Sequence, residues 1–171
     1  IEITPDEGRR LITSSSGDKK GRVAIVTGSV GCGKSTFVTR VLVDVKKEKK
    51  ESLAAVKVDL IDEAMDDSAR VVPDLWKYIA EQWKKAAPES YENETLRKIF
   101  GRQLLELRQG PYKEIFAEDG RLLLQREADL LDKLVTDPEV FFRECWRYYQ
   151  QKGRGVVVFL DNVDRASESY Q

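Results

Sequence analysis

One segment near the N-terminus restricts the folds open to this chain more than any other: residues 28–36, which read Gly-Ser-Val-Gly-Cys-Gly-Lys-Ser-Thr. The segment satisfies the pattern G-x-x-x-x-G-K-[ST], in which glycines let the backbone curl around a phosphate with its N–H groups pointing inward. Residues 23–27 before it are rich in β-branched side chains and predict a buried strand, and apolar residues repeat at helical spacing after it. This order of strand, loop and helix predicts a binding site for nucleotide phosphates.

The chemistry gives each part of this segment a role. The loop's N–H groups would cradle the phosphates, and the helix that begins near Gly33 directs the positive end of its dipole at the same anion. Lys34 can reach the β- and γ-phosphates, and the hydroxyl of Ser35 can bind Mg²⁺. The predicted phosphate-binding residues are Gly28, Ser29, Val30, Gly31, Cys32, Gly33, Lys34, Ser35 and Thr36.

Length, charge and residue usage narrow the class of protein further. The 171 residues suit one α/β domain with a substantial core, and 29 basic against 30 acidic residues give a net charge of −1, which does not support nucleic-acid binding. No apolar run is long enough to cross a bilayer, so we expect no membrane attachment. Histidine is absent, which excludes His-based triads and the usual zinc sites, and the two cysteines favour a cytoplasmic protein over a disulfide-stabilised one.

A second informative segment lies near the C-terminus. Residues 156–160 are consecutively apolar, as in a central parallel strand buried on both faces, and Asp161 follows them. Ligands of such sheets gather beyond the carboxyl ends of the strands. The segment therefore resembles a Walker B segment, in which Asp161 holds Mg²⁺, directly or through water, together with Ser35.

The two segments together resemble those of P-loop NTPases. The sequence Asp-Asn-Val-Asp-Arg at 161–165 is most similar to the AAA-like and STAND-type ATPases, including KAP-type and origin-recognition-like members. The match covers residues 23–36 and 156–165, and the helical block between them, about half of the chain, carries no motif that can be assigned. The resemblance implies that residues 1–171 form one P-loop NTPase domain, incomplete at its C-terminus, which is the N-terminal part of a larger ATPase module.

The expected fold is α/β, with a P-loop NTPase parallel sheet core built from residues 23–27, 53–59 and 156–160. Between the second strand and the Walker B strand, residues 73–152 read as a large helical insertion. The apolar stripes expected to face its core are Leu75, Trp76, Ile79, Ala80 and Trp83; Leu96, Ile99, Phe100, Leu104 and Leu107; Leu124, Ala128, Leu131 and Val135; and Phe142, Cys145, Trp146 and Tyr149.

The resemblance implies Mg·ATP binding and slow ATP hydrolysis, by the nucleotide switch or motor of a multidomain signalling or defence-type protein. Self-association or a partner protein would act through the further domains. The position after Asp161 often carries an acid that positions the attacking water, whereas here Asn162 can orient water but cannot take its proton. Asp164 is the nearest carboxylate able to act as base, and a cap paired with Arg165 explains it equally well. The expected catalytic residues are Lys34, Asn162 and Asp164.

Two functions of other classes stay open. One is a DNA-handling ATPase of the replication-initiation or transposition type, for which the basic residues in 46–50 would be a local patch. The other is a non-hydrolysing, nucleotide-gated interaction module, in which Asn162 marks lost catalysis. Binding of GTP in place of ATP is a further alternative, although the N-K-x-D motif that reads its base is absent.

Overall fold

The computed structural model of the chain describes residues 26, 31–48, 53–60 and 71–162. These residues form a mixed α/β fold that is mostly helical and contains a two-stranded parallel sheet. No helix within these ranges is long and apolar enough to cross a bilayer. The chain divides into two compact units, each described by itself: Ile1–Ala64 with Tyr149–Gln171, and Met65–Tyr148.

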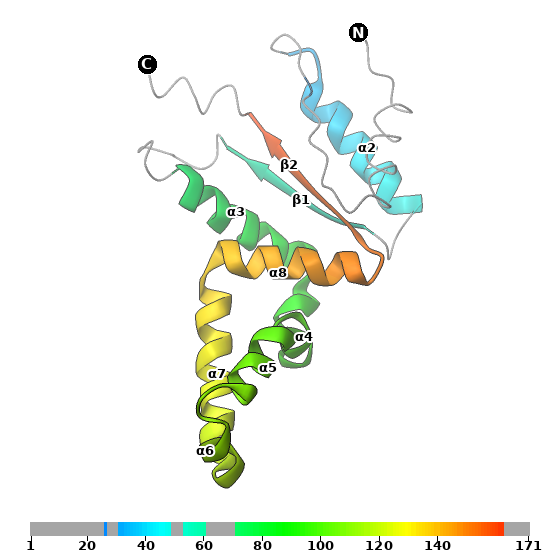
Figure 1. Cartoon of the computed structure of the whole chain (residues 1–171). Helices are drawn as coiled ribbons and strands as arrows, with labels where there is room; N and C mark the ends of the chain where they lie inside the picture. The colour runs from blue at the N-terminus through cyan, green and yellow to red at the C-terminus, as the bar shows by residue number, and fades with distance from the viewer. Residues whose placement is uncertain (1–25, 27–30, 49–52, 61–70, 163–171) are drawn as a thin grey trace. The chain divides into compact units, whose positions relative to one another are not determined.

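In the first unit, helix α2 (Lys34–Glu48) lies beside strands β1 (Leu53–Asp59) and β2 (Gly155–Asp161) (Figure 1). The strands are parallel and in register from Leu53 opposite Gly155 to Asp59 opposite Asp161, so their carboxyl ends meet at one edge. The prediction of both strands is confirmed: β1 has the predicted bounds, and β2 is one residue longer at each end. Lys57 is the one exposed side chain within β1.

A small apolar core joins α2 to the sheet. Val38 and Leu42, one helical turn apart on α2, are buried with Ala55 of β1, and the partly buried Val26, Phe37, Val157 and Phe159 pack against them. Val26 is the only described residue of the predicted strand 23–27, and the rest of that strand lies outside the described residues. The predicted third strand of the sheet therefore stays a prediction.

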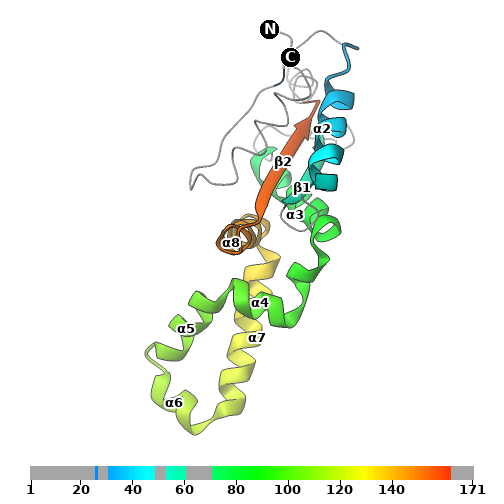
Figure 2. The same ribbon diagram turned by 90° about the vertical axis from the view of Figure 1, so that its right-hand side faces the viewer.

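The second unit is helical. In order, its elements are α3 (Val71–Ala86), the 3₁₀ turn η2 (Pro88–Tyr91), α4 (Asn93–Ile99), α5 (Gly101–Gln109), α6 (Lys113–Glu118), α7 (Gly120–Thr136) and α8 (Pro138–Gln151), of which the residues up to Tyr148 belong to this unit. Helices α5 and α6 lie beside α7 (Figure 2). Helix α8 begins as the pair Asp-Pro at 137–138 predicts, because the Asp137 carboxylate accepts a hydrogen bond from the Val140 N–H at 3.1 Å.

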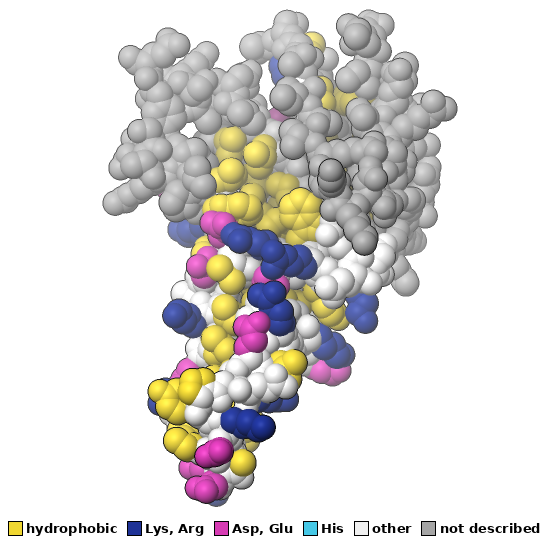
Figure 3. All heavy atoms as spheres, in the orientation of Figure 1, with side chains coloured by type: hydrophobic (Ala, Val, Ile, Leu, Met, Phe, Trp, Pro, Cys, Tyr) yellow, Lys and Arg dark blue, Asp and Glu magenta, His cyan; other side chains and the backbone are white. Residues whose placement is uncertain are grey.

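Aromatic side chains form the core of this unit. Trp83 of α3 is fully buried and meets Phe142 of α8 edge to face, with ring centroids 5.3 Å apart. The indole N–H of Trp83 donates to the buried hydroxyl of Ser90 at 3.2 Å, which satisfies both polar groups. Burial raises the pKa of the nearby Cys145 thiol to about 12. On the visible face of the unit, basic and acidic side chains are interspersed with hydrophobic ones (Figure 3).

Two of the predicted apolar stripes differ in detail from the structure. The residues of the stripe over 96–107 are buried or half-buried as predicted, but they lie on two helices. Helix α4 ends at Ile99, and α5 begins at Gly101, after the fully buried Phe100 (φ −96°, ψ 19°).

On α7 the stripe is confirmed at Leu131, which is buried, and at Val135, which is half-buried. It is wrong in the first half of the helix, where Leu124 is 59% exposed and Ala128 is exposed, whereas the charged Glu127 is buried. Glu127 faces the inside of the unit although it is charged, so a prediction that uses only the spacing of apolar residues does not find it.

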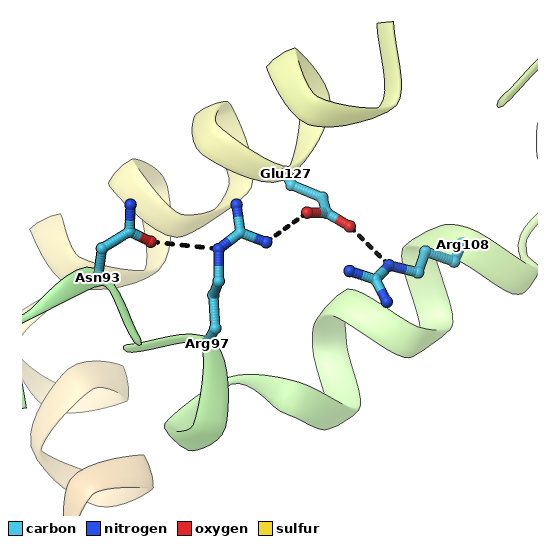
Figure 4. A network of polar contacts seen from close by, with 4 residues as sticks. All are labelled: Asn93, Arg97, Arg108 and Glu127. Atoms are coloured by element: carbon cyan, nitrogen blue, oxygen red, sulfur yellow. Dashed lines mark hydrogen bonds and ion pairs between the residues drawn. The ribbon is translucent and has the colours of Figure 1, made fainter. Parts of the chain in front are cut away.

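Glu127 is buried because two arginines meet it (Figure 4). Arg97 of α4 donates to one carboxylate oxygen and Arg108 of α5 to the other, each at 2.6 Å, and Arg97 also donates to Asn93 at 3.2 Å. The side chain of Glu127 is 1% exposed, and those of Arg97 and Arg108 are 36% and 51% exposed. The hydrogen bond from Arg108, with that from Arg97, lowers the pKa of Glu127 although burial opposes the shift.

This cluster predicts a pH dependence of stability. A lowered pKa in the folded state means that ionised Glu127 stabilises the fold at neutral pH, and that this contribution is lost as the pH falls through the folded-state pKa. We expect the free energy of unfolding of Glu127→Gln to be about 1–2 kcal/mol lower than that of the wild type at neutral pH, and the difference to close as the pH falls below the ordinary pKa of glutamate. Urea denaturation followed by circular dichroism measures the free energy of unfolding of the wild type and of the variant at each pH. The matched control is Glu94→Gln, which removes an exposed carboxylate paired with Lys98; a gap that persists at acid pH contradicts the prediction.

Candidate functional site

The candidate site lies in the first unit, where the carboxyl ends of β1 and β2 meet the N-terminus of α2 (Figure 1). Ser35 is in the first turn of α2, and Asp161 is the last residue of β2. The Ser35 hydroxyl donates a hydrogen bond of 2.8 Å to Oδ1 of Asp161, across 126 positions of sequence. The two residues predicted to hold one ion therefore lie in direct contact.

The loop before α2 has the backbone that its glycines permit. Gly31 and Gly33 have φ values of +80° and +86°, in the left-handed region that other residues rarely adopt. A Cβ atom at either position would meet nothing within 4 Å, so the backbone conformation, and not lack of space, demands glycine. The Phe37 N–H donates to the Gly33 carbonyl at 2.8 Å, which places the start of the helical hydrogen-bonding pattern at Gly33.

The other predicted loop residues are placed unevenly. Cys32 and Thr36 are exposed, and Lys34 is half-buried at the start of α2. Gly28, Ser29 and Val30 lie outside the described residues, as does Asp164. Their predicted roles stay predictions.

Asp161 is held on both carboxylate oxygens. Its Oδ1 also accepts from the Asn162 N–H at 3.1 Å, and the amine of Lys57 lies 3.1 Å from its Oδ2. Burial acts to raise the pKa of Asp161, but the hydrogen bonds from Ser35 and Lys57 and the positive charge of Lys57 hold that pKa below its usual value. The carboxylate is therefore ionised at neutral pH.

Asn162 and Asp59 form a second polar pair at the same edge. Asn162 has a φ of +59°, and its side-chain Nδ2 donates to Oδ1 of Asp59 at 2.7 Å. Asp59 ends β1 directly opposite Asp161. Sequence reasoning singled out neither Asp59 nor Lys57. Two signals were present in the sequence. Asp59 is an acid at the end of a predicted strand, as Asp161 is, and Lys57 is a charged residue within the otherwise apolar part of that strand.

The chemistry of these donors fits Mg²⁺. Within the described residues no group of three or more His, Cys, Asp or Glu side chains could hold a metal ion. Mg²⁺ does not need such a group, because it keeps several waters and is bound by one or two carboxylates together with substrate phosphates. One hydroxyl and one ionised carboxylate, beside the loop that the sequence predicts to bind phosphates, match that requirement.

The chain was compared with known proteins at the level of families, sequences and folds. It matches no protein-family model, no curated protein and no solved structure. The site is therefore interpreted from its own residues.

Proposed function

We propose that this chain binds ATP with Mg²⁺ and hydrolyses it slowly, as the nucleotide switch or motor of a larger protein of the AAA-like or STAND type. One observation carries the proposal: the hydrogen bond between Ser35 and Asp161. It joins the loop motif to the end of the Walker B-like strand. Two motifs that match by chance have no reason to meet, whereas two parts of one magnesium site do.

Each residue of the site then has a defined task. The N-terminus of α2 and the loop N–H groups bind the phosphates, and Lys34 stabilises the negative charge on the transferred γ-phosphoryl group. Ser35 and Asp161 hold Mg²⁺, which when bound neutralises charge on the phosphates. Asn162 and Asp164 are the residues predicted to place the water. Phosphoryl transfer depends mainly on positioning and charge, so a site with an amide after Asp161 suits slow turnover.

The first test is nucleotide binding by the full-length protein. A fluorescent N-methylanthraniloyl derivative of ATP, titrated with MgCl₂ present, should bind the wild type and release phosphate in a steady-state assay. Lys34→Ala is expected to weaken binding by about 10²-fold, because it removes the side-chain charge at the phosphates. Lys113→Ala, which removes an exposed lysine of α6, is the matched control. Absence of wild-type binding overturns the proposal, and tight binding without turnover identifies the non-hydrolysing module instead.

A further inference from the structure

A carboxylate of the neighbouring strand contacts the side chain of Asn162. Asp59 lies directly opposite Asp161 in the parallel register, and strands in a sheet are about 4.8 Å apart. The side-chain Nδ2 of Asn162 donates to Oδ1 of Asp59 at 2.7 Å. The donor group of Asn162 thus points at Asp59.

The backbone at Asn162 is set for this contact. Its φ of +59° is in the left-handed region, which asparagine adopts more readily than most residues. The N–H of the same residue donates to Asp161 at 3.1 Å. Asn162 therefore holds both strand-end acids at once, Asp161 through its backbone and Asp59 through its side chain.

The two acids have different printed contacts at this edge. Asp161 contacts Ser35 of the predicted magnesium site and Lys57. Asp59 accepts a hydrogen bond from the side-chain amide of Asn162, the residue that follows Asp161, and this contact fixes the direction of its carboxylate. We propose that Asp59 is the carboxylate that orients the attacking water, and that Asn162 is the residue that positions Asp59. This role rests on the proposed function, because it requires that the chain hydrolyses ATP.

The reaction needs no permanent proton acceptor on the chain. The water oxygen bonds to the γ-phosphorus, and the bond to the β–γ bridging oxygen breaks with its electron pair leaving on ADP. The proton of the water passes to the released phosphate. Asp59 accepts a hydrogen bond from the water and so aligns it for attack, which is the positioning on which phosphoryl transfer depends.

The test separates ground-state binding from transition-state binding in the full-length protein. Asp59→Asn should leave the affinity for Mg·ATP within about threefold of the wild type, because it removes no phosphate contact. It should lower both kcat and the affinity for Mg·ADP with fluoroaluminate, a mimic of the transition state, by about 10²-fold. Asn162→Ala should lower the same two quantities by about tenfold, and the double variant should be no worse than Asp59→Asn alone. Asp132→Asn, on the exposed face of α7, is the control.

Each result has one meaning. Unchanged kcat and unchanged fluoroaluminate affinity in Asp59→Asn overturn the role of Asp59 while the proposed function stands, since the wild type still turns over. A parallel loss of ATP affinity and a higher Mg²⁺ requirement also overturn it, because they make Asp59 a binding group. If Asp59→Asn fails to fold, as judged by circular dichroism, the affinities for Mg·ATP and for Mg·ADP with fluoroaluminate are measured on Asn162→Ala and Asp59→Glu instead. Unchanged fluoroaluminate affinity in both variants then overturns the role of Asp59. If the wild type does not hydrolyse ATP, the proposed function is wrong, and the role of Asp59 falls with it.

Discussion

The Asp161→Ala variant is expected to hydrolyse ATP about 10³-fold more slowly than the wild type, with a higher requirement for Mg²⁺. The substitution removes the carboxylate that accepts a hydrogen bond from Ser35 and leaves the positive charge of Lys57 without the carboxylate it pairs with. A Mg²⁺ titration at fixed ATP, followed by phosphate release, measures both effects. Asp132→Ala is the matched control, since it removes an exposed carboxylate from α7.

Asp161→Asn refines this result. The amide keeps the shape of the side chain and can still accept from Ser35, so the first turn of α2 should keep its place, whereas the charge that attracts Mg²⁺ is lost. Turnover close to that of Asp161→Ala shows that charge, and not shape, is what the site requires. Wild-type turnover in both variants contradicts the assignment of Asp161 to the metal.

The largest effect on stability is expected from Trp83→Ala in the helical unit, at about 3–5 kcal/mol of the free energy of unfolding. The indole is fully buried, meets Phe142 edge to face, and donates to Ser90, so its loss leaves both a cavity and an unsatisfied buried hydroxyl. Urea denaturation followed by circular dichroism at 222 nm measures the change, because this unit is helical.

Leu124→Ala is the matched control for this experiment. Leu124 is a large apolar residue of the same unit but is 59% exposed, so the cost should stay below about 0.5 kcal/mol. Equal costs for the two variants would mean that the aromatic cluster is not the core of this unit. A shift confined to one part of a two-step transition would instead report that the two units unfold separately.

Much of the fold was predictable because its signals are local. A continuous apolar run marks a buried strand wherever it lies in a chain, and β1 and β2 agree with the predicted strands to within one residue at each end. The pairing of Ser35 with Asp161 was predictable for a different reason: each belongs to a motif whose chemistry requires the other.

What escaped prediction depends on distant contacts. Asp59 and Asn162 are 103 positions apart in the sequence, and the register of β1 and β2 brings them together. No local sequence pattern specifies that register. Glu127 is buried because arginines from α4 and α5 pair with it. A prediction of apolar stripes does not include it, because it is charged. The break between α4 and α5 falls at Phe100, whose ring is fully buried, so the apolar spacing runs on across it and gives no sign of it.

The ion cluster at Glu127 also bears on cooperativity. Helices α4 and α5 have 7 and 9 residues, lengths at which an isolated helix is not stable in water. Both helices pair with the same carboxylate of α7, that of Glu127, so loss of this group destabilises α4 and α5 together. We therefore expect α4, α5 and α7 to open as a single foldon, with one common free energy of exchange for their backbone amides.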